Sequence, residues 1–223
     1  MTPKRKDNKQ YYFTVEGETE KWYLDWLEKE INANLDSDPE ATVKVSIKSK
    51  VEKNPLKFAK SIPILTKVEI THWFDYESHE HVKQFSETLD RLKEANNIRG
   101  KQIKYLLGYS NLTFELWMAL HKNNYNAHTE HRAHYLRHIN NAFGEQFTEL
   151  STYKEQDNFK RMLRKLTLDD VKTAVRRSKS IMQRNSENGL QVIQHAGFKY
   201  FKDNPSLTIH ESVEKILRDC NLI

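Results

Sequence analysis

The sequence predicts an α/β fold, and three observations lead to this prediction. Apolar, β-branched segments alternate with amphipathic segments over the first half of the chain. Two of the apolar segments end abruptly in carboxylates, and a later one is apolar throughout, as strands inside parallel sheets are. We therefore expect a mostly parallel four-stranded sheet flanked by helices.

The first two strands and helices each have a recognisable pattern. Residues 9–15 are aromatic and β-branched, which is typical of a strand, and residues 18–32 carry apolar side chains at helical spacing. Residues 43–47 alternate with a period of two, which predicts a half-exposed strand. We expect the next helix to begin at Pro55, because proline is tolerated at the first helical position.

The third and fourth strands follow in the same alternation. Residues 68–74 predict a strand, and residues 79–95 predict a helix with one apolar stripe. Residues 103–109 form the uninterrupted apolar strand. Residues 112–121 then predict a short helix that is apolar on almost every side.

The second half of the chain shows a different pattern. A single short strand is expected near residues 191–192, and helical periodicity dominates at residues 130–142, 156–166, 168–187 and 209–219. We therefore divide the chain into an α/β core, residues 1–122, and a helical C-terminal extension, residues 123–223, packed on it.

Composition narrows the class of protein. Charged residues make up 30% of the 223 residues and the mean hydropathy is −0.83, which describes a heavily solvated surface. No apolar stretch reaches the length that spans a bilayer, and the first residues lack the apolar core of a signal peptide. The single cysteine, Cys220, excludes an internal disulfide and suits a reducing compartment. We expect a cytoplasmic protein without membrane partners.

Acidic residues follow two of the expected strands. Glu16 follows the first strand, and Asp75 and Glu77 follow the third. Carboxyl ends of parallel strands meet at the sheet edge where ligands usually bind, and carboxylate oxygens suit Mg²⁺ or Mn²⁺. In an extended backbone Asp75 and Glu77 would point to the same side. The pattern predicts a metal site with Glu16, Asp75 and Glu77 as ligands and catalytic groups, whereas Glu18 and Glu20 could simply complement a helix dipole.

A second motif, Ser110-Asn111-Leu112-Thr113-Phe114-Glu115-Leu116-Trp117, surrounds an isolated acid. Asn111 is expected to cap the helix that follows it. Glu115 is the only charged residue between Lys104 and Lys122, so it must find donors, a cation or a proton. Both a structural anchor and a catalytic role are open for Glu115. His121 could contact a phosphate at the sheet edge or favour the helix dipole as a C-terminal cap.

Basic residues and histidines concentrate in the second half. The net charge is +5, and a nucleic-acid surface would use residues of the expected helices: Arg161, Arg164, Lys165, Arg176 and Arg177. Solvated helix faces are the alternative. Four histidines are spaced by three or four residues, but no cysteine or His-Glu-x-x-His motif accompanies them, so a polar helix face is favoured over a zinc site: His128, His131, His134 and His138.

Three motifs in this order resemble the RloB family: Glu16-Gly17-Glu18-Thr19-Glu20, Asp75-Tyr76-Glu77 and the Ser110–Trp117 motif closed by His121. The segment Asn204-Pro205-Ser206-Leu207-Thr208-Ile209-His210 is also similar to the family's closing segment, so the resemblance covers nearly the whole chain. The resemblance implies a Toprim-like core and a place in AbiL-type abortive infection, a form of anti-phage defence, beside a separately encoded ATPase.

The resemblance also implies roles for individual residues. Glu16 matches the strand-end glutamate of Toprim domains, and Asp75 and Glu77 match the Asp-x-Asp pair that holds magnesium for phosphodiester chemistry. Gly17, Glu20, Asn111 and His121 are expected to support the site. Two departures stand out: a glutamate, Glu77, at the second acid, and Leu112-Thr113 where the family usually has proline and a small residue.

These observations predict a metal-dependent nuclease that cleaves DNA or RNA, with tRNA among the candidate substrates. The alternative is a non-catalytic nucleic-acid-binding or sensor subunit that works with an ATPase. Expected partners are nucleic acid, the ATPase and further copies of the chain. Transfer or synthesis of nucleotides ranks last, because the sequence has no Walker-type loop.

Overall fold

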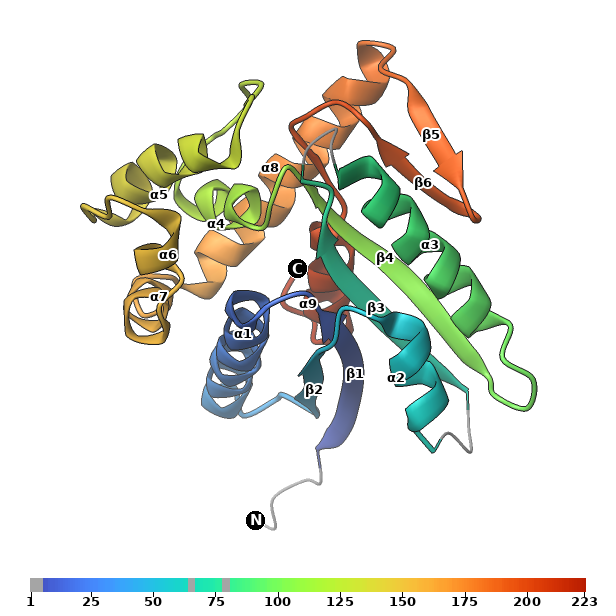
Figure 1. Ribbon diagram of the computed structural model, residues 1–223. Helices are drawn as coiled ribbons and strands as arrows, with labels where there is room; N and C mark the ends of the chain where they lie inside the picture. Colours follow the sequence, from blue (N-terminus) through green and yellow to red (C-terminus); the bar gives the residue numbers. More distant parts are fainter. Residues whose placement is uncertain (1–5, 64–66, 78–80) are drawn as a thin grey trace.

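A five-stranded, mostly parallel sheet forms the centre of the protein (Figure 1). The computed structural model describes residues 6–63, 67–77 and 81–223. The strand order is β2-β1-β3-β4-β7, with β1 to β4 parallel and β7 antiparallel to β4. The bounds are β1 Asp7–Val15, β2 Val43–Val51, β3 Val68–Asp75, β4 Ile103–Asn111 and β7 Ser206–Leu207. The predicted α/β class is therefore confirmed.

The prediction of four strands is wrong by one, because the C-terminal half returns to the sheet. Ser206 and Leu207 pair with Asn111 and Ser110 at the end of β4. A strand of two residues is too short to show a period of two, so the sequence pattern does not predict β7. The division of the chain at residue 122 stays a prediction.

A separate hairpin joins β5 (Val192–His195) to β6 (Phe198–Phe201). Its two central residues, Ala196 and Gly197, have φ values of 53° and 91°. Two-residue hairpin loops favour such positive φ angles because their twist matches that of the strands. The short strand expected near residues 191–192 is the first strand of this hairpin.

Nine α-helices and a short 3₁₀ helix lie in the described ranges. They are α1 Glu18–Ser37, α2 Pro55–Ser61, α3 Val82–Asn96, α4 Glu115–Lys122, α5 Tyr135–Phe143, α6 Leu150–Tyr153, α7 Gln156–Leu163, α8 Leu168–Glu187, α9 Ile209–Asp219 and the 3₁₀ turn Arg132–His134. The predicted start of α3 at His79 lies outside the described residues. The helix predicted from residue 112 begins three residues later, because β4 continues through Asn111.

Helices cover the two faces of the sheet and enclose separate hydrophobic cores. The larger core contains side chains of α1 and of the helices α4 through α9, which pack on Phe13, Val15 and Trp73 of the sheet. The smaller core lies under α2, α3 and β6. In Figure 1, α2 and α3 lie on one side of the sheet and α1 and α9 on the other. The arrangement is a layered α/β fold in which alternate strand residues enter different cores.

Close packing places a specific demand on β4. A Cβ atom built on Gly108 would lie 2.3 Å from Cδ1 of Trp73 on the neighbouring strand. Glycine therefore leaves the space in which the Trp73 ring crosses β4 and donates from Nε1 to Ser212 Oγ of α9 at 3.1 Å. This contact anchors the C-terminal helix to the sheet.

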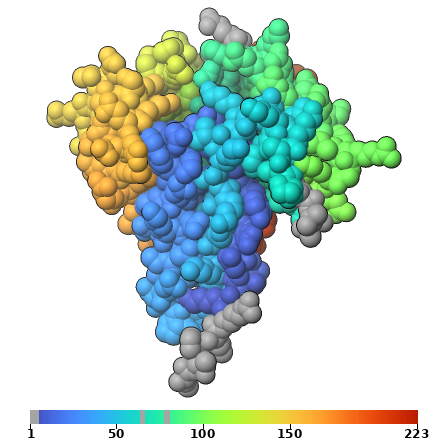
Figure 2. All heavy atoms as spheres, turned by 60° about the horizontal axis from the view of Figure 1, so that its bottom comes forward, coloured from blue at the N-terminus to red at the C-terminus, as the bar shows by residue number. Residues whose placement is uncertain are grey.

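The helices after residue 123 lie on one side of α1 and α4. α1 contacts α7, and α4 contacts α5 and α8. In Figure 2 the yellow and orange segment lies directly against the blue N-terminal segment. Within the described ranges, no helix combines the length and apolar character needed to cross a membrane.

Candidate active site

Two acids meet at the carboxyl edge of the parallel sheet, as the sequence predicts. Glu16 follows β1 and Asp75 ends β3, and these strands are neighbours in which Val15 lies opposite Trp73. The backbone N–H of Asp75 donates to Oε2 of Glu16 at 3.0 Å. The parallel pairing of β1 and β3 therefore brings both acids to one edge.

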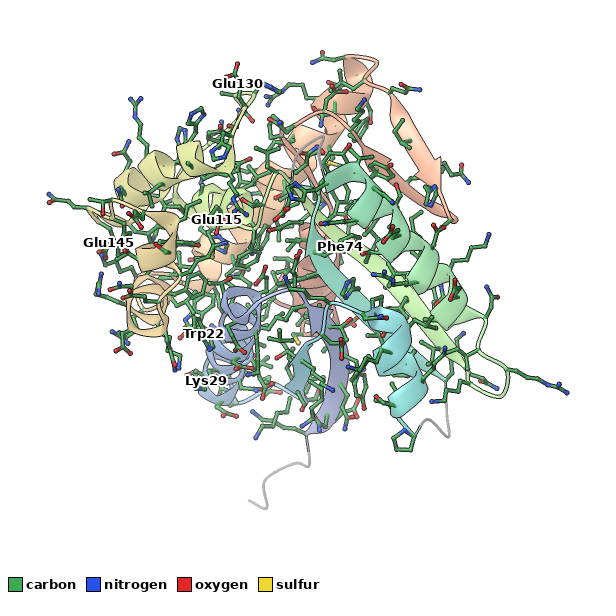
Figure 3. All side chains as sticks on the ribbon, in the orientation of Figure 1. Trp22, Lys29, Phe74, Glu115, Glu130 and Glu145 are labelled. Carbon is green, nitrogen blue, oxygen red and sulfur yellow. The ribbon has the colours of Figure 1, made fainter. Side chains whose placement is uncertain are left out.

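Two helix N-termini add further acids. Glu20, in the first turn of α1, is 5% exposed and accepts a hydrogen bond from Thr19 Oγ1 at 2.9 Å. Glu115, the first residue of α4, is wholly buried. Figure 3 places Glu115 inside the molecule beside α4. We call Glu16, Glu20, Asp75 and Glu115 the acidic cluster.

Lys154, at the end of α6, is the cation of this cluster. Its Nζ lies 3.0 Å from Oε1 of Glu115. Burial opposes the charge of Lys154, but the neighbouring acids Glu115, Asp75 and Glu20 outweigh it and raise the pKa of Lys154 to about 12. Lys154 therefore stays charged inside the cluster.

The acids nevertheless outnumber the lysine. Burial first, and then the charges of Glu20, Glu16 and Glu115, raise the pKa of Asp75 well above its ordinary value, although Lys154 lowers it. Burial also raises the pKa of Glu20, against a backbone hydrogen bond and Lys154. The raised pKa values favour the neutral form of Asp75 and Glu20, because Lys154 alone does not balance the negative charge of all these acids.

Several buried polar atoms near the cluster lack partners. Neither carboxylate oxygen of Glu115 forms a hydrogen bond of good geometry with any described group, although Oε1 is ion-paired with Lys154. The Tyr153 hydroxyl is also buried without a described partner, and burial followed by the charges of Glu115, Glu20 and Asp75 raises its pKa. Unsatisfied buried atoms in one place are typical of a site that receives a ligand or ion.

Sequence analysis missed Lys154, and it did not place Tyr153 at this site. They lie at the end of the four-residue helix α6, which is too short to give a periodic signal. Glu20, expected only as a supporting residue, is a member of the cluster. Gly17 permits this, since a Cβ atom there would lie 3.0 Å from Oε2 of Glu20.

Glu77 departs from the predicted arrangement. Its φ is +59°, so the backbone is not extended there as expected, although Asp75 and Glu77 both line one cavity. Its backbone N–H donates to Leu112 O at 2.8 Å, which fixes this turn. The Glu77 carboxylate instead pairs with Arg132 and His81, each at 3.2 Å.

The motif residues Asn111 and His121 have structural contacts. Asn111 ends β4 and donates from Nδ2 to Lys202 O at 2.8 Å, so the expectation that it caps a helix is wrong. His121 is 1% exposed, and its ring atoms lie 3.0 Å from Tyr23 Oη and 2.9 Å from Trp117 O. Burial lowers the pKa of His121 to about 4. Both ring nitrogens are thus occupied inside the core, away from any phosphate.

The predicted basic residues do not form one unpaired surface. Arg161 and Lys165 both pair with Glu145, at 2.8 Å and 2.6 Å. Arg177 donates to Leu120 O at 2.7 Å near the end of α4. Arg164 and Arg176 are exposed. Cations at or near the sheet edge include Lys53, Arg91, Arg132 and Lys154, and each is ion-paired with an acid.

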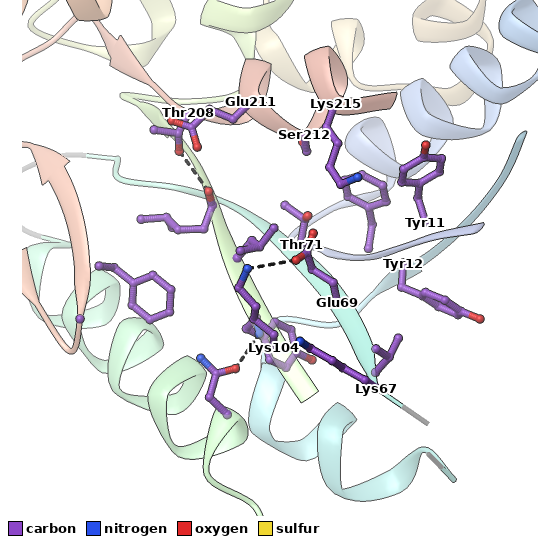
Figure 4. Close-up of a pocket in the computed structure, with 18 of the residues that line it drawn as sticks. Tyr11, Tyr12, Lys67, Glu69, Thr71, Lys104, Thr208, Glu211, Ser212 and Lys215 are labelled. Carbon is purple, nitrogen blue, oxygen red and sulfur yellow. Dashed lines mark hydrogen bonds and ion pairs between the residues drawn. The ribbon is translucent and has the colours of Figure 1, made fainter. Parts of the chain in front are cut away.

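Two cavities lie on different parts of the sheet. The larger, about 900 Å³, lies over the amino-terminal half of β3 and β4 beside α9, where Lys104 and Glu69 pair at 3.1 Å (Figure 4). The smaller, about 290 Å³, lies at the carboxyl edge and is lined by Glu16, Asp75 and Glu77 as well as by α3. We call the smaller cavity the edge pocket. Its acids make it the relevant cavity for chemistry, despite its size.

The described part of the chain contains no preformed three-ligand metal centre. Among the residues that the structure describes, no group of three or more His, Cys, Asp and Glu side chains is arranged to hold a metal ion. This includes the histidines of residues 128–138, of which His131 accepts a hydrogen bond from Ala133 N and His138 packs on Tyr125. Magnesium commonly uses only one or two carboxylates, with water and substrate phosphate as its other ligands.

Comparison with known proteins gives one match. A family model described as RloB-like protein matches residues 11–216. A search of curated proteins and a search of solved structures each found no match.

Proposed function

The chain belongs to the RloB-like family, and from this premise we propose that it is a metal-dependent nuclease that hydrolyses phosphodiester bonds of DNA or RNA. The observation that carries the proposal is the convergence of Asp75, Glu20 and Glu115 around Lys154 at the carboxyl edge of the sheet. Clustered acids with perturbed pKa values are typical of functional sites.

The acidic cluster fits a divalent cation. Burial and then the neighbouring acids raise the pKa of Asp75, and Lys154 is the one described partner of the Glu115 carboxylate. Asp75 and Glu16 are the ligands we propose for Mg²⁺ or Mn²⁺, with Glu115 and Glu77 beside them. When bound, such a cation supplies Lewis acidity and lowers the pKa of a bound water.

Lys154 gives the protein its own means of binding a phosphodiester. Its ammonium group keeps its charge next to Glu115 and attracts the substrate phosphate to the sheet edge. A fixed positive charge also stabilises the negative charge that develops as the phosphodiester is cleaved. The buried side chains around Glu20 exclude bulk water, which strengthens these interactions.

A Toprim-like core and a role in anti-phage defence are further parts of the proposal. The acids that follow β1 and β3 of a parallel sheet support the Toprim-like core. The defence role, the separately encoded ATPase and oligomer formation rest on the family resemblance, as does tRNA as one candidate substrate.

Cleavage of plasmid DNA and tRNA with Mg²⁺ or Mn²⁺ tests the activity. We expect Asp75→Ala and Glu16→Ala to abolish cleavage, because they remove the proposed ligands. Glu18→Ala is the matched control, since Glu18 lies two residues after Glu16, in the first turn of α1, but is exposed. Cleavage that survives both Asp75→Ala and Glu16→Ala would contradict the proposal.

A non-catalytic binding or sensor subunit is the second candidate. It is favoured by the ion pair of Lys154 with Glu115, which already places a cation among the acids, and by the engagement of Glu77 with Arg132. Calorimetric titration with Mn²⁺ separates the two candidates. Saturable binding that Asp75→Ala removes supports the enzyme, whereas no binding supports the non-catalytic subunit.

A further inference from the structure

The parallel sheet has an open edge along β4. The short strand β7 pairs with only Ser110 and Asn111, at the end of β4, because α9 begins at Ile209. Among the described strands, the earlier residues of β4 have β3 as their one neighbour. Such an edge presents backbone N–H and C=O groups to which another chain can add, and many proteins cover it for this reason.

The contacts of Tyr109 show which residues of β4 face this open edge. Its carbonyl oxygen points away from β3 and accepts a hydrogen bond from Thr208 N at 2.9 Å. Every second residue of a strand turns its N–H and C=O groups to the same side. Tyr105 and Leu107 therefore also turn their backbone groups to the open edge.

Two of the four backbone groups of Tyr105 and Leu107 already have partners. Asn96 Oδ1 accepts from Tyr105 N at 2.5 Å, and Thr208 Oγ1 donates to Leu107 O at 3.2 Å. Within the described ranges, the other two groups, Tyr105 O and Leu107 N, have no hydrogen-bond partner. One acceptor and one donor thus face outward on either side of Leu106, and an extended chain bonds such a pair.

The larger of the two cavities, about 900 Å³, lies along this open edge (Figure 4). Tyr105, Leu106 and Leu107 line it on one side, and residues of the β5–β6 hairpin and of α9 line it on the others. We call this cavity the β4 groove. Its described lining includes no member of the acidic cluster, so the groove is separate from the site proposed for catalysis.

One wall of the β4 groove is apolar. Ala196 and Phe198 of the hairpin and Leu107 of β4 line the groove and pack, half-buried, against the smaller core. Lys104 points to the opposite face of the sheet from Leu107, because the two lie three residues apart in a strand. An extended chain along the edge therefore meets apolar side chains on one of its faces.

The β4 groove also carries an excess of positive charge. Its charged lining residues are Lys67, Lys104, Lys199, Lys215, Glu69 and Glu211. Lys104 pairs with Glu69 at 3.1 Å, and Lys215 pairs with Asp219 at 2.7 Å. Lys67 and Lys199 are exposed and form no ion pair with any described residue. These two lysines are available to acidic groups of a ligand.

We propose that the β4 groove binds an extended segment of a partner protein in which acidic and apolar residues alternate. The segment adds to the sheet as a strand, and its backbone bonds to Tyr105 O and Leu107 N. Its apolar side chains contact the wall that contains Phe198, and its acidic side chains turn towards Lys67 and Lys104. A nucleic acid strand suits the groove less well, because it lacks the regular N–H and C=O groups that complement a strand edge. The inference does not rest on the proposed nuclease activity.

Fluorescence anisotropy tests the inference with a defined peptide. The probe is a fluorescein-labelled peptide of about eight residues in which glutamate and valine alternate, long enough to follow β4 past Tyr105 and Leu107. We expect saturable binding to the full-length protein at low salt. The control peptide has the same composition but all its glutamates precede its valines, and it should bind about tenfold more weakly, because it cannot present one kind of side chain to each face.

Pairing of the backbone has its own test. Two versions of the alternating peptide carry N-methyl groups, one on every glutamate and the other on every valine. Alternate residues of a strand turn their N–H groups to the same side, so one version loses every N–H that faces β4 and the other keeps them. We expect one version to bind like the parent peptide and the other to lose binding. Equal affinities of the two versions would overturn the addition of a strand.

Reversal of charge assigns the binding to the β4 groove. The double variant Lys67→Glu with Lys199→Glu should weaken peptide binding by about tenfold at low salt. The matched control, Lys29→Glu with Lys44→Glu, makes the same change of charge at exposed positions of α1 and β2 and should leave the affinity within about twofold. Circular dichroism checks that both variants are folded.

The outcomes decide between a peptide and other occupants. The inference is overturned if the alternating peptide does not bind, or if its affinity survives the double reversal of Lys67 and Lys199. It is also overturned if single-stranded oligo-dT binds and loses affinity in that variant while the peptide does not bind, because the groove is then a nucleic-acid surface. The proposed nuclease activity is tested separately, since Asp75 and Glu16 are unchanged in these proteins.

Discussion

Lys154 and Glu115 form an ion pair in which the acid is wholly buried and the lysine comes from the C-terminal half of the chain. The pair joins the N-terminus of α4 to the end of α6. It also explains how a helix that is otherwise apolar tolerates a carboxylate. A buried charge of this kind must be paired.

Removal of the lysine should therefore destabilise the protein. We expect Lys154→Met to lower the free energy of unfolding by about 3 kcal/mol, the low end for a buried pair because Lys154 is partly exposed, since Glu115 is left without its cation. Urea denaturation measures this loss. The double variant with Glu115→Gln should recover part of it. Lys53→Met, which removes an exposed pair with Glu16, should cost less than about 1 kcal/mol, and equal losses for both lysines would contradict the expectation.

Substitution of Gly17 should disturb the acidic cluster without unfolding α1. A Cβ atom at Gly17 would lie 3.0 Å from Oε2 of Glu20, so both Gly17→Ala and Gly17→Ser should displace this carboxylate and weaken Mn²⁺ binding. Gly17 is the N-cap of α1, a position that serine suits and alanine does not, so only Gly17→Ala should also lower stability, by about 1 kcal/mol. Calorimetry and thermal unfolding separate the two effects, and unchanged Mn²⁺ affinity in both variants would argue against a role for Glu20.

The buried histidines should make the protein sensitive to mild acid. Burial lowers the pKa of His121 and His210 to about 4 from an ordinary value of 6.5. Between pH 6.5 and about 4 these histidines are protonated in the unfolded chain but stay neutral in the folded chain. The stability of the folded state that comes from the neutral histidines is therefore lost as the pH falls through this range. His121→Gln should reduce the change in the free energy of unfolding with pH by up to about 1.4 kcal/mol per pH unit.

Denaturant unfolding at several pH values measures this slope. The comparison must be with the wild type, because the raised pKa values of Asp75 and Glu20 act in the opposite direction. If the free energy of unfolding depends on pH equally in both proteins, the pKa of His121 is not lowered by folding.

Glu145 should stabilise the protein in a way that acid abolishes. The hydrogen bond from Arg161, followed by the one from Lys165, lowers the pKa of Glu145 to about 2 although partial burial raises it. The stabilisation is present above the ordinary pKa of 4.5 and is lost as the pH falls towards 2. Glu145→Gln should therefore be less stable than the wild type at pH 7 and equally stable near pH 2. A difference that persists at low pH would point to packing instead.

The alternation of apolar segments was sufficient to predict the parallel part of the fold. Strands β1 to β4 and helices α1 to α3 carry local patterns that depend on which side chains face the core. The convergence of Glu16 and Asp75 could also be predicted, because parallel strands end at the same edge. Glu77 could not be placed, since its positive φ depends on contacts with Leu112 and Arg132.

The sequence by itself determined the α/β class, the four parallel strands and the two acids that end β1 and β3, because each follows from the local periodicity of side chains. Only the tertiary structure decided that Lys154 pairs with Glu115, that β7 extends the sheet and that His72 Nε2 is buried without a partner among the described residues. These features depend on contacts between segments far apart in the chain. Burial and charge at such contacts arise only when the segments pack together.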